Sequence, residues 1–358
     1  MYFGYPIAAV AENWLHECMV EVVTTIHVRL NARQRALAWP LIIPEACRAR
    51  LNSRTGLRNY LTTYTKAARK LDPAQRAQVL NCLQQQNAIA DLVSCASNCD
   101  GLSDLPAEIR APAKDLFVFA FGLLTDLGVR DRHYAIIHEA CKHQVCPFCC
   151  SEYFDAPGAP REDYDHYLAV SRYPFAAANL RNLTPMGMKC NERYKRDQDV
   201  LRDEAGNRRL SFDPYANRQL GVSLMNSIPF GQDDEKTPVW HIDFVPESPE
   251  CATWDSVFQI RTRLSRDILD QSFSHWLTVF AGWFVRRKGT GDTSDAHLIA
   301  AVREHAEDIE LAGMKAREFL CGPVFRMIEL RCTNGDNRLL QFIRDLITQA
   351  VPQPVSLV

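Results

Sequence analysis

One stretch of the sequence, residues 146–195, constrains the fold and chemistry of this chain more than any other. It carries three short motifs: a Cys146-x-x-Cys149 pair, an Asp165-His166 dipeptide in an apolar-alternating run, and a Cys190-Asn191 dipeptide that opens a basic amphipathic segment. Two thiolates at Cys-x-x-Cys spacing can close on one soft cation. A carboxylate next to a histidine supplies a hard oxygen ligand and a proton acceptor. The stretch therefore predicts a small module that combines a cysteine cluster with a polar site.

The order and separations of these motifs, with Asn182 between them, resemble the HNH (ββα-metal) endonuclease family. In that family a DH dipeptide on a strand, an asparagine in the following turn and a C-[HN] dipeptide on a helix assemble one metal site. The resemblance is confined to residues 146–195 of the 358-residue chain. It implies a ββα-metal fold for this module and hydrolysis of phosphodiester bonds in DNA, with RNA left open as a substrate.

The resemblance also implies a role for each polar residue. Asp165 corresponds to the carboxylate metal ligand, His166 to the general base, and Asn191 to a second ligand through its amide oxygen. Asn182 would hold the connecting loop and help to orient His166. The expected ion is Mg²⁺ or Mn²⁺, a hard cation that neutralises charge at the scissile phosphate. Because adjacent strand residues start on opposite faces, a twist or bulge is needed to bring Asp165 and His166 to one phosphate.

Many members of the family clamp the module with two Cys-x-x-Cys pairs around a structural zinc ion. Here the second pair reads Gly187-Met-Lys-Cys190, so one sulfur is missing. A tetrahedral zinc site that uses Cys146, Cys149 and Cys190 needs a fourth ligand. The candidates near the knuckle are His143, Cys150 and Cys141, and His143 has ligand-like spacing to Cys146. The alternative is a knuckle that is held by packing and keeps free thiols.

Basic residues fall into two groups that could contact nucleic acid. The first group surrounds the predicted catalytic helix and would reach phosphates beside the cut: Lys189, Arg193, Lys195 and Arg196. The second is a basic block over residues 28–70, with ten Lys/Arg against the single acid Glu45. Within this block Arg50, Arg54 and Arg58 are predicted to contribute to DNA affinity. The alternative for the block is a solvated helix face paired with acids from elsewhere.

The remainder of the chain predicts a mainly α protein with a small α+β insert. Residues 1–130 predict a helical domain with a basic face, containing a long helix over 7–35, helices that begin at Pro44 and after Asp72, and a buried helix over 112–127. Residues 131–222 are assigned to the ββα-metal domain, including a strand-like stretch at 210–212. Residues 223–358 predict a mostly helical C-terminal domain, with a linker at 231–238, a strand at 239–245 and helices at 253–263, 265–287, 293–312 and 336–350.

Composition and sequence ends favour a cytoplasmic protein with no membrane partner. The net charge is −2 and no apolar run approaches the roughly 20 residues that a membrane helix needs. The N-terminal sequence lacks the basic region and cleavage pattern of a signal peptide. The thirteen cysteines are dispersed through a large chain, which favours reduced thiols with one local metal cluster over disulfides.

These patterns together predict a metal-dependent DNA endonuclease with one active site per chain, which would most simply nick one strand. Its position between helical segments suits a bacterial phage-defence or mobile-element nuclease, by association only. Two rivals from other functional classes stay open. The first is a non-catalytic nucleic-acid-binding protein in which the module is only scaffold. The second is a subunit of a larger assembly, whose helical flanks dock a protein partner that controls access to DNA.

Overall fold

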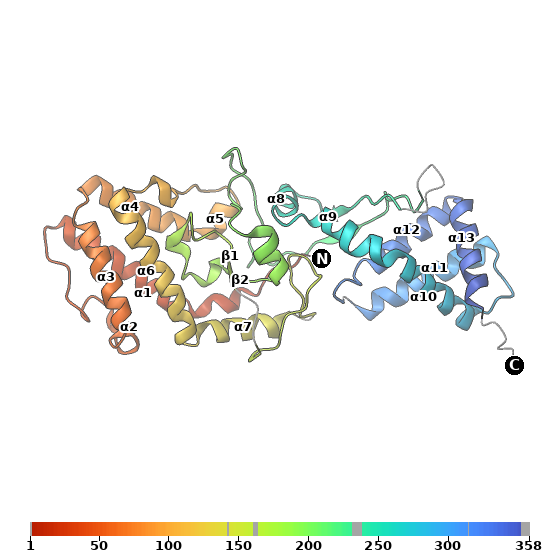
Figure 1. The fold of residues 1–358 in the computed structure, drawn as a ribbon, viewed down its shortest axis with the longest axis horizontal. Coiled ribbons are helices and arrows are strands. Elements are labelled where there is room, and N and C mark those ends of the chain that lie inside the picture. Colours follow the sequence, from red (N-terminus) through yellow and green to blue (C-terminus); the bar gives the residue numbers. More distant parts are fainter. Residues whose placement is uncertain (1, 142, 160–163, 231–237, 314, 352–358) are drawn as a thin grey trace.

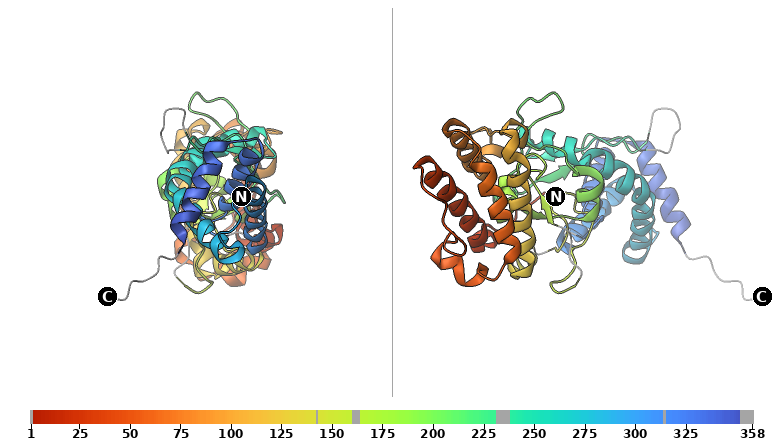
Figure 2. Two further views of the ribbon diagram at one scale, coloured as in Figure 1. Left: turned by 90° about the vertical axis from the view of Figure 1, so that its right-hand side faces the viewer. Right: turned by 60° about the vertical axis from the view of Figure 1, so that its left-hand side comes forward.

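The computed structural model describes residues 2–141, 143–159, 164–230, 238–313 and 315–351. Helices form both ends of an elongated molecule, and a small module with short strands lies between them (Figure 1). The right-hand view of Figure 2 shows the same separation of the N-terminal and C-terminal helices, whereas the left-hand view looks along the long axis of the molecule. The prediction of a mainly α protein with a small β-containing insert is confirmed. The predicted linker at 231–238 lies, apart from Pro238, outside the described residues.

Seven α-helices build the N-terminal half. They are α1 (Trp14–Asn31), α2 (Glu45–Leu51), α3 (Thr55–Ala68), α4 (Pro73–Asn87), α5 (Ile89–Val93), α6 (Ala107–Asp126) and α7 (Val129–Ala140), with 3₁₀ turns η1 (Ile7–Glu12) and η2 (Leu102–Asp104). The predicted single helix over 7–35 is wrong, because η1 ends before α1 begins and α1 stops at Asn31. The predicted cap is confirmed: Asp72 accepts a hydrogen bond from Gln75 N, and Gln75 reciprocates in a capping box.

Helix α6 is the central element of this half. Its buried side chains, from Ile109 to Leu124, pack against α1 and α3. The predicted start at Pro112 is too late, since α6 begins at Ala107 and Pro112 lies within its second turn. The helix ends before Gly128, whose φ of 66° suits a residue without a side chain. The predicted burial holds for one side of α6, whereas the other side stays accessible, where Val118 is 39% exposed.

The central module runs strand, strand, helix in chain order. Strand β1 (Tyr164–His166) pairs antiparallel with β2 (Leu183–Pro185), with Asp165 opposite Thr184. The connection between them contains the 3₁₀ turns η3 (Pro174–Ala176) and η4 (Leu180–Asn182). A seven-residue π-helical segment, η5 (Lys189–Lys195), follows β2. The predicted strand at 210–212 is absent, and Ser211 N instead donates to Val93 O at 2.9 Å.

The first residues of the chain cross into this central module. Phe3 forms a β-bridge with Gln219, and Leu220 N donates to Tyr2 O at 2.8 Å. The Tyr2 ring stacks on Phe212 with centroids 4.5 Å apart. The N-terminal residues therefore pack against residues 212–220 and form part of the core of the central module.

The C-terminal half returns to helices after a short hairpin. Strands β3 (Gly221–Ser223) and β4 (Asp243–Val245) pair antiparallel. The helices are α8 (Pro249–Phe258), α9 (Ile260–Leu264), the π-helical η6 (Ser265–Leu269), α10 (Asp270–Lys288), α11 (Asp295–Ala312), α12 (Cys321–Thr333) and α13 (Asn337–Ala350). Helix α12 was not predicted, because Gly322 and Pro323 indicate a break. Both lie in the first turn, where proline removes no intrahelical hydrogen bond. No helix among the described residues is both long and apolar enough to span a bilayer.

Candidate functional site

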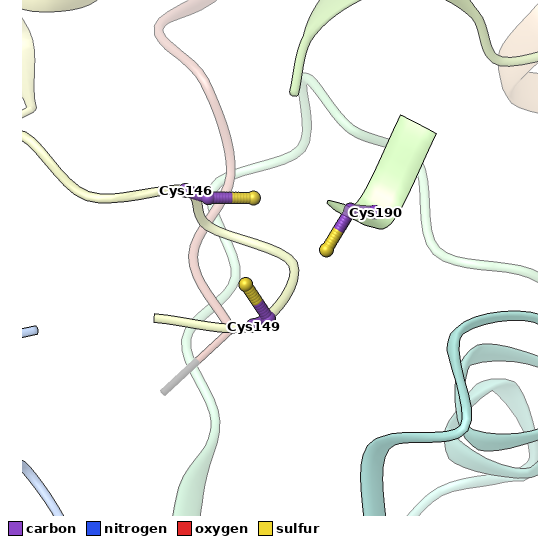
Figure 3. Close-up of side chains that lie close together, drawn as sticks. All are labelled: Cys146, Cys149 and Cys190. Carbon is purple, nitrogen blue, oxygen red and sulfur yellow. The ribbon is translucent and has the colours of Figure 1, made fainter. Parts of the chain in front are cut away.

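Three cysteines from two distant segments meet in the central module. The sulfur atoms of Cys146, Cys149 and Cys190 all lie within 4.8 Å of one another, and all three residues are buried (Figure 3). Cys146 and Cys149 lie on one turn, and Cys190 is the second residue of η5. The group could therefore hold a metal ion such as zinc, for which thiolates are favoured ligands. All thirteen cysteines of the chain are free, as the sequence predicts.

Backbone hydrogen bonds shape the knuckle that presents these sulfurs. Cys150 N donates to Cys146 O at 2.8 Å, and Cys150 has a φ of 53° that turns the chain back. Cys146 N then donates to Glu152 O at 2.8 Å, and Val145 bridges to Tyr153. The resulting hairpin places the sulfurs of both Cys-x-x-Cys residues on the side that faces η5.

A buried arginine completes the surroundings of the sulfurs. Arg263 of α9 donates through Nη1 to Cys190 Sγ at 3.3 Å and to Phe258 O at 3.2 Å. Thiol donors at Cys146 and Cys190 hold the pKa of Cys149 well below its usual range, with help from the Arg263 charge. Burial raises the pKa of Cys146 and Cys190. Arg263 was not among the predicted site residues, because nothing in a C-terminal helix marks it in the sequence as a neighbour of the knuckle.

The structure does not bring the predicted fourth zinc ligands into the group. His143 is exposed, and its ring lies outside the set of mutually close ligand atoms among the described residues. Cys141 and Cys150 are buried, yet their sulfurs also lie outside this set. The ligand-like spacing of His143 to Cys146 therefore does not bring the two together, since His143 is exposed and Cys146 is buried.

Asp165 of β1 forms a buried ion pair with Lys195 of η5. Lys195 Nζ lies 2.9 Å from Oδ2 and 3.2 Å from Oδ1 of Asp165, and it also donates to His166 O at 2.9 Å. Burial raises the pKa of Asp165, and the Lys195 charge opposes that shift. Lys195 was predicted to contact phosphates, but its side chain is fully buried. It instead joins the end of η5 to β1.

A hard cation at Asp165 would share the carboxylate with Lys195. A carboxylate and the amide oxygen of Asn191 are the donor types that Mg²⁺ accepts, and a carboxylate has more lone pairs than one ammonium uses. Asn191 is half-buried one helical turn before Lys195, so both lie toward the same side of η5. The donor chemistry therefore fits Mg²⁺ or Mn²⁺, while the adjacent ammonium competes with such an ion electrostatically.

His166 points away from Asp165, as strand alternation requires. Its Nε2 lies 3.1 Å from Ala177 O, and its ring centroid lies 4.4 Å from that of Phe121 on α6. Burial lowers the pKa of His166 to about 4, and the charges of Lys195 and Arg130 act in the same direction. The imidazole is therefore neutral at pH 7. With Nε2–H donated to the carbonyl, Nδ1 carries the lone pair, and the side chain as a whole is half-buried.

Asn182 holds the loop that connects β1 to β2. The amide is fully buried: Leu168 N donates to its Oδ1 at 2.7 Å, and its Nδ2 donates to Leu168 O at 3.1 Å and Ala176 O at 3.2 Å. Ala176 directly precedes Ala177, whose carbonyl contacts His166. A single buried amide therefore connects the loop backbone to the position of the imidazole.

The exposed basic residues form two separate surfaces. Near η5, Arg193 and Arg196 are exposed and Lys189 is half-buried. In the basic block, Arg50 and Arg58 are exposed, while Arg54 pairs with Asp126 at 3.3 Å. Figure 1 places α2 and α3 at the outer N-terminal end, with α1 and α6 between them and β1. Arg50 approaches the module most closely: its guanidinium lies 4.8 Å from the Trp14 ring centroid, and the neighbouring Asn13 accepts a hydrogen bond from Leu180 N at 2.9 Å.

One further arginine lies beside His166, and the sequence analysis missed it. The Arg130 guanidinium lies 4.9 Å from the Phe121 ring centroid and 4.6 Å from that of Tyr164. Phe121 also contacts the His166 ring, so the cation, the two aromatic rings and the imidazole form one continuous wall. Only the packing of α6 and α7 against β1 reveals this arrangement.

Comparisons with known proteins add no family assignment. No protein-family model matches the chain, and neither the curated proteins nor the solved structures give a match.

Proposed function

We propose that the central module is a metal-dependent endonuclease that hydrolyses phosphodiester bonds in DNA. The observation that carries this proposal is the environment of His166. Its imidazole is neutral at pH 7, its tautomer is set by the Ala177 carbonyl at 3.1 Å, and the loop behind that carbonyl is held by Asn182. A neutral imidazole with a free Nδ1 lone pair is suited to take a proton from an attacking water.

Each of the other residues has a distinct part in the proposed mechanism. Asp165 and Asn191 would hold Mg²⁺ or Mn²⁺, which when bound supplies charge neutralisation at the phosphate. Asn182 positions His166 through the loop. Lys189, Arg193 and Arg196 would bind phosphates on either side of the cut. The cysteine group, with a structural zinc ion, would keep η5 in place against the knuckle and so maintain the distance between β1 and Asn191.

Nicking of supercoiled plasmid tests this function directly. We expect the purified chain with Mg²⁺ or Mn²⁺ to nick DNA, and His166→Ala to reduce the rate by about 10²–10⁴-fold, the usual effect of losing a general base. His275 is exposed on α10, so His275→Ala is the matched control and should keep the wild-type rate. DNA affinity should be similar in both variants. Nicking by His166→Ala at the wild-type rate would remove His166 from the mechanism.

A second candidate is a non-catalytic nucleic-acid-binding subunit of a larger assembly. One observation favours it: Lys195 Nζ already lies 2.9 Å from the carboxylate that a catalytic metal would use. In that case the module has only a structural role, and the Lys195 ammonium takes the place of an exchangeable metal ion at Asp165. Binding of DNA without any metal-dependent nicking, by protein that is fully folded, would favour this candidate over the nuclease.

A further inference from the structure

Gly187 stands where the family resemblance places the missing fourth cysteine, and the space beside it is filled. A Cβ built on Gly187 would lie 2.5 Å from Oε2 and 3.0 Å from Cδ of Glu152. The sulfur of a cysteine lies one bond beyond its Cβ. The Glu152 carboxyl group therefore occupies the space that the side chain of a cysteine at position 187 would need. Glu152 belongs to the hairpin that carries Cys146 and Cys149.

The backbone of Glu152 is hydrogen-bonded to the turn that carries Cys146 and Cys149. Its carbonyl accepts the hydrogen bond from Cys146 N at 2.8 Å, so its backbone is held against the knuckle. The neighbouring Ser151 N donates to Cys149 Sγ at 3.5 Å. Burial raises the pKa of the Glu152 carboxyl, and negative charge at Cys149 adds to the shift. The acid is therefore a close neighbour of the sulfur group.

One oxygen of this carboxylate lacks a partner. Oε1 accepts a long hydrogen bond from Lys189 N at 3.4 Å, whereas Oε2 is buried and has no hydrogen-bond partner among the described residues. A buried carboxylate oxygen without a partner is costly, which is why such groups in proteins are paired or bind metals. Beside three buried thiols, the group that would satisfy this oxygen is a cation.

We propose that Glu152 is the fourth ligand of a zinc site that it forms with Cys146, Cys149 and Cys190. Its oxygens lie outside the set of atoms within 4.8 Å of one another, so the side chain turns inward when the ion binds. Zinc accepts carboxylate oxygens at roughly 2.0–2.2 Å. Three thiolates and a carboxylate exceed the charge of one Zn²⁺, and Arg263, 3.3 Å from Cys190 Sγ, offsets part of the excess. Gly187 leaves the room in which the carboxylate moves.

A simpler role for Glu152 is to cap the start of η5 through Lys189 N. The variant Glu152→Gln separates the two roles. Its amide oxygen can still accept from Lys189 N, but an amide is a weak zinc ligand. If Glu152 only caps the helix, this variant leaves zinc binding unchanged. If Glu152 is a ligand, the variant loses zinc affinity while the metal-free protein keeps its stability.

Zinc affinity of the full-length chain is the first measurement. Metal-free protein is titrated with Zn²⁺ in competition with a chromophoric chelator. We expect close to one zinc per chain in the wild type, and Glu152→Gln and Glu152→Ala to weaken zinc binding by at least about 10–100-fold, since even outer-shell changes have effects of that size. The exposed Glu192 on η5 provides the control Glu192→Gln, which should bind as the wild type does.

Restoring the absent sulfur is the second measurement. In the double variant Glu152→Ala/Gly187→Cys, the side chain that would collide with residue 187 is removed and a fourth thiol is supplied. Zinc affinity should return to the wild-type level or exceed it. Cobalt-loaded protein should show a visible absorption spectrum that differs between the wild type and this double variant, because one oxygen ligand is replaced by sulfur.

The outcomes separate the ligand role from every alternative. Wild-type zinc affinity and an unchanged cobalt spectrum in Glu152→Gln would overturn the proposal, as would a wild-type chain that binds no zinc. If Glu152→Ala does not fold, Glu152→Gln still decides the question. None of these readouts uses nuclease activity, so the zinc site stands or falls independently of the proposed function.

Discussion

The Lys195 ammonium lies 2.9 Å from Oδ2 of Asp165, and both side chains are buried between η5 and β1. Where the family resemblance places a divalent cation, the chain itself supplies a monovalent one. This pair neutralises the carboxylate and attaches the last turn of η5 to the strand that carries His166. A metal ion that binds Asp165 must therefore compete with an ammonium already in contact with it.

Breaking this pair should destabilise the protein strongly. Lys195→Met leaves the Asp165 charge buried without its partner, which typically lowers the free energy of unfolding by about 3–5 kcal/mol. The double variant Asp165→Asn/Lys195→Met removes both charges and should recover most of that loss. Urea denaturation of the single and double variants measures the coupling. Arg193→Met, an exposed position on the same helix, serves as the control. Equal stabilities of the single and double variants would contradict the pairing.

Competition between Lys195 and a metal ion should be visible in thermal melting. Saturating Mg²⁺ is expected to raise the melting temperature of Lys195→Met by more than that of the wild type, because the vacated carboxylate binds the cation without a rival. Asp165→Asn/Lys195→Met, which lacks the ligand, should show no such gain. An identical Mg²⁺ response in all three proteins would exclude Asp165 as the ligand.

The buried amide of Asn182 should affect both stability and catalysis. Asn182→Ala leaves Leu168 N and Leu168 O without the amide, while Ala176 O keeps its hydrogen bond from Asn179 N, so we expect a loss on the order of 3 kcal/mol in the free energy of unfolding. Nicking should slow with little change in DNA affinity, because the Ala177 carbonyl no longer holds His166. Chemical denaturation and single-turnover nicking measure the two effects. Asn226→Ala, at an exposed position, is the control.

Acid should destabilise the N-terminal helices through buried histidines. Burial lowers the pKa of His27 to about 4, below the usual 6.5, so the unfolded chain binds the proton more readily. The contribution of neutral His27 to the free energy of unfolding is therefore complete above pH 6.5. It is lost as the pH falls toward 4, and the loss reaches about 3 kcal/mol. His27→Phe should flatten the dependence of unfolding free energy on pH in that window. His16, with its pKa lowered to about 4 by burial, offers an independent repeat. Parallel curves for wild type and variants would contradict this assignment.

The two basic surfaces should differ in what they do for DNA. Charge reversal of Arg50, Arg54 and Arg58 should weaken binding and reduce the salt dependence by about one unit of slope per lost phosphate contact. The nicking rate of saturated complexes should stay the same, because these residues, on α2, at the N-cap of α3 and on α3, include neither a proposed metal ligand nor the proposed base. Reversal of Arg193 and Arg196 should reduce both binding and nicking. Filter binding across a salt series, with nicking at saturating DNA, distinguishes the two surfaces. An unaltered slope would assign the block to a solvated face.

Local patterns determined much of this protein. The start of α4 after Asp72 and the long helix α10 follow from residues close in sequence, whereas the order of two strands and a helix was expected from the family resemblance. Helix periodicity and capping act over a few residues, so the sequence carries them directly. The pair of Cys146 and Cys149 was expected from Cys-x-x-Cys spacing, and Cys190 was added to it by the family resemblance.

Only the tertiary structure decided which charges meet inside the module. The sequence pattern predicts Lys195 to be one more basic residue on a surface helix. Its burial depends on the way η5 packs on β1. Arg263 and Glu152 reach the cysteine group from α9 and from the hairpin, at sequence separations that no short pattern encodes. Each of these contacts affects stability strongly, because removing a charge from water costs free energy unless an opposite charge or a hydrogen-bonding group lies next to it. The sequence determines which residues are present, whereas packing determines which of them are removed from water together.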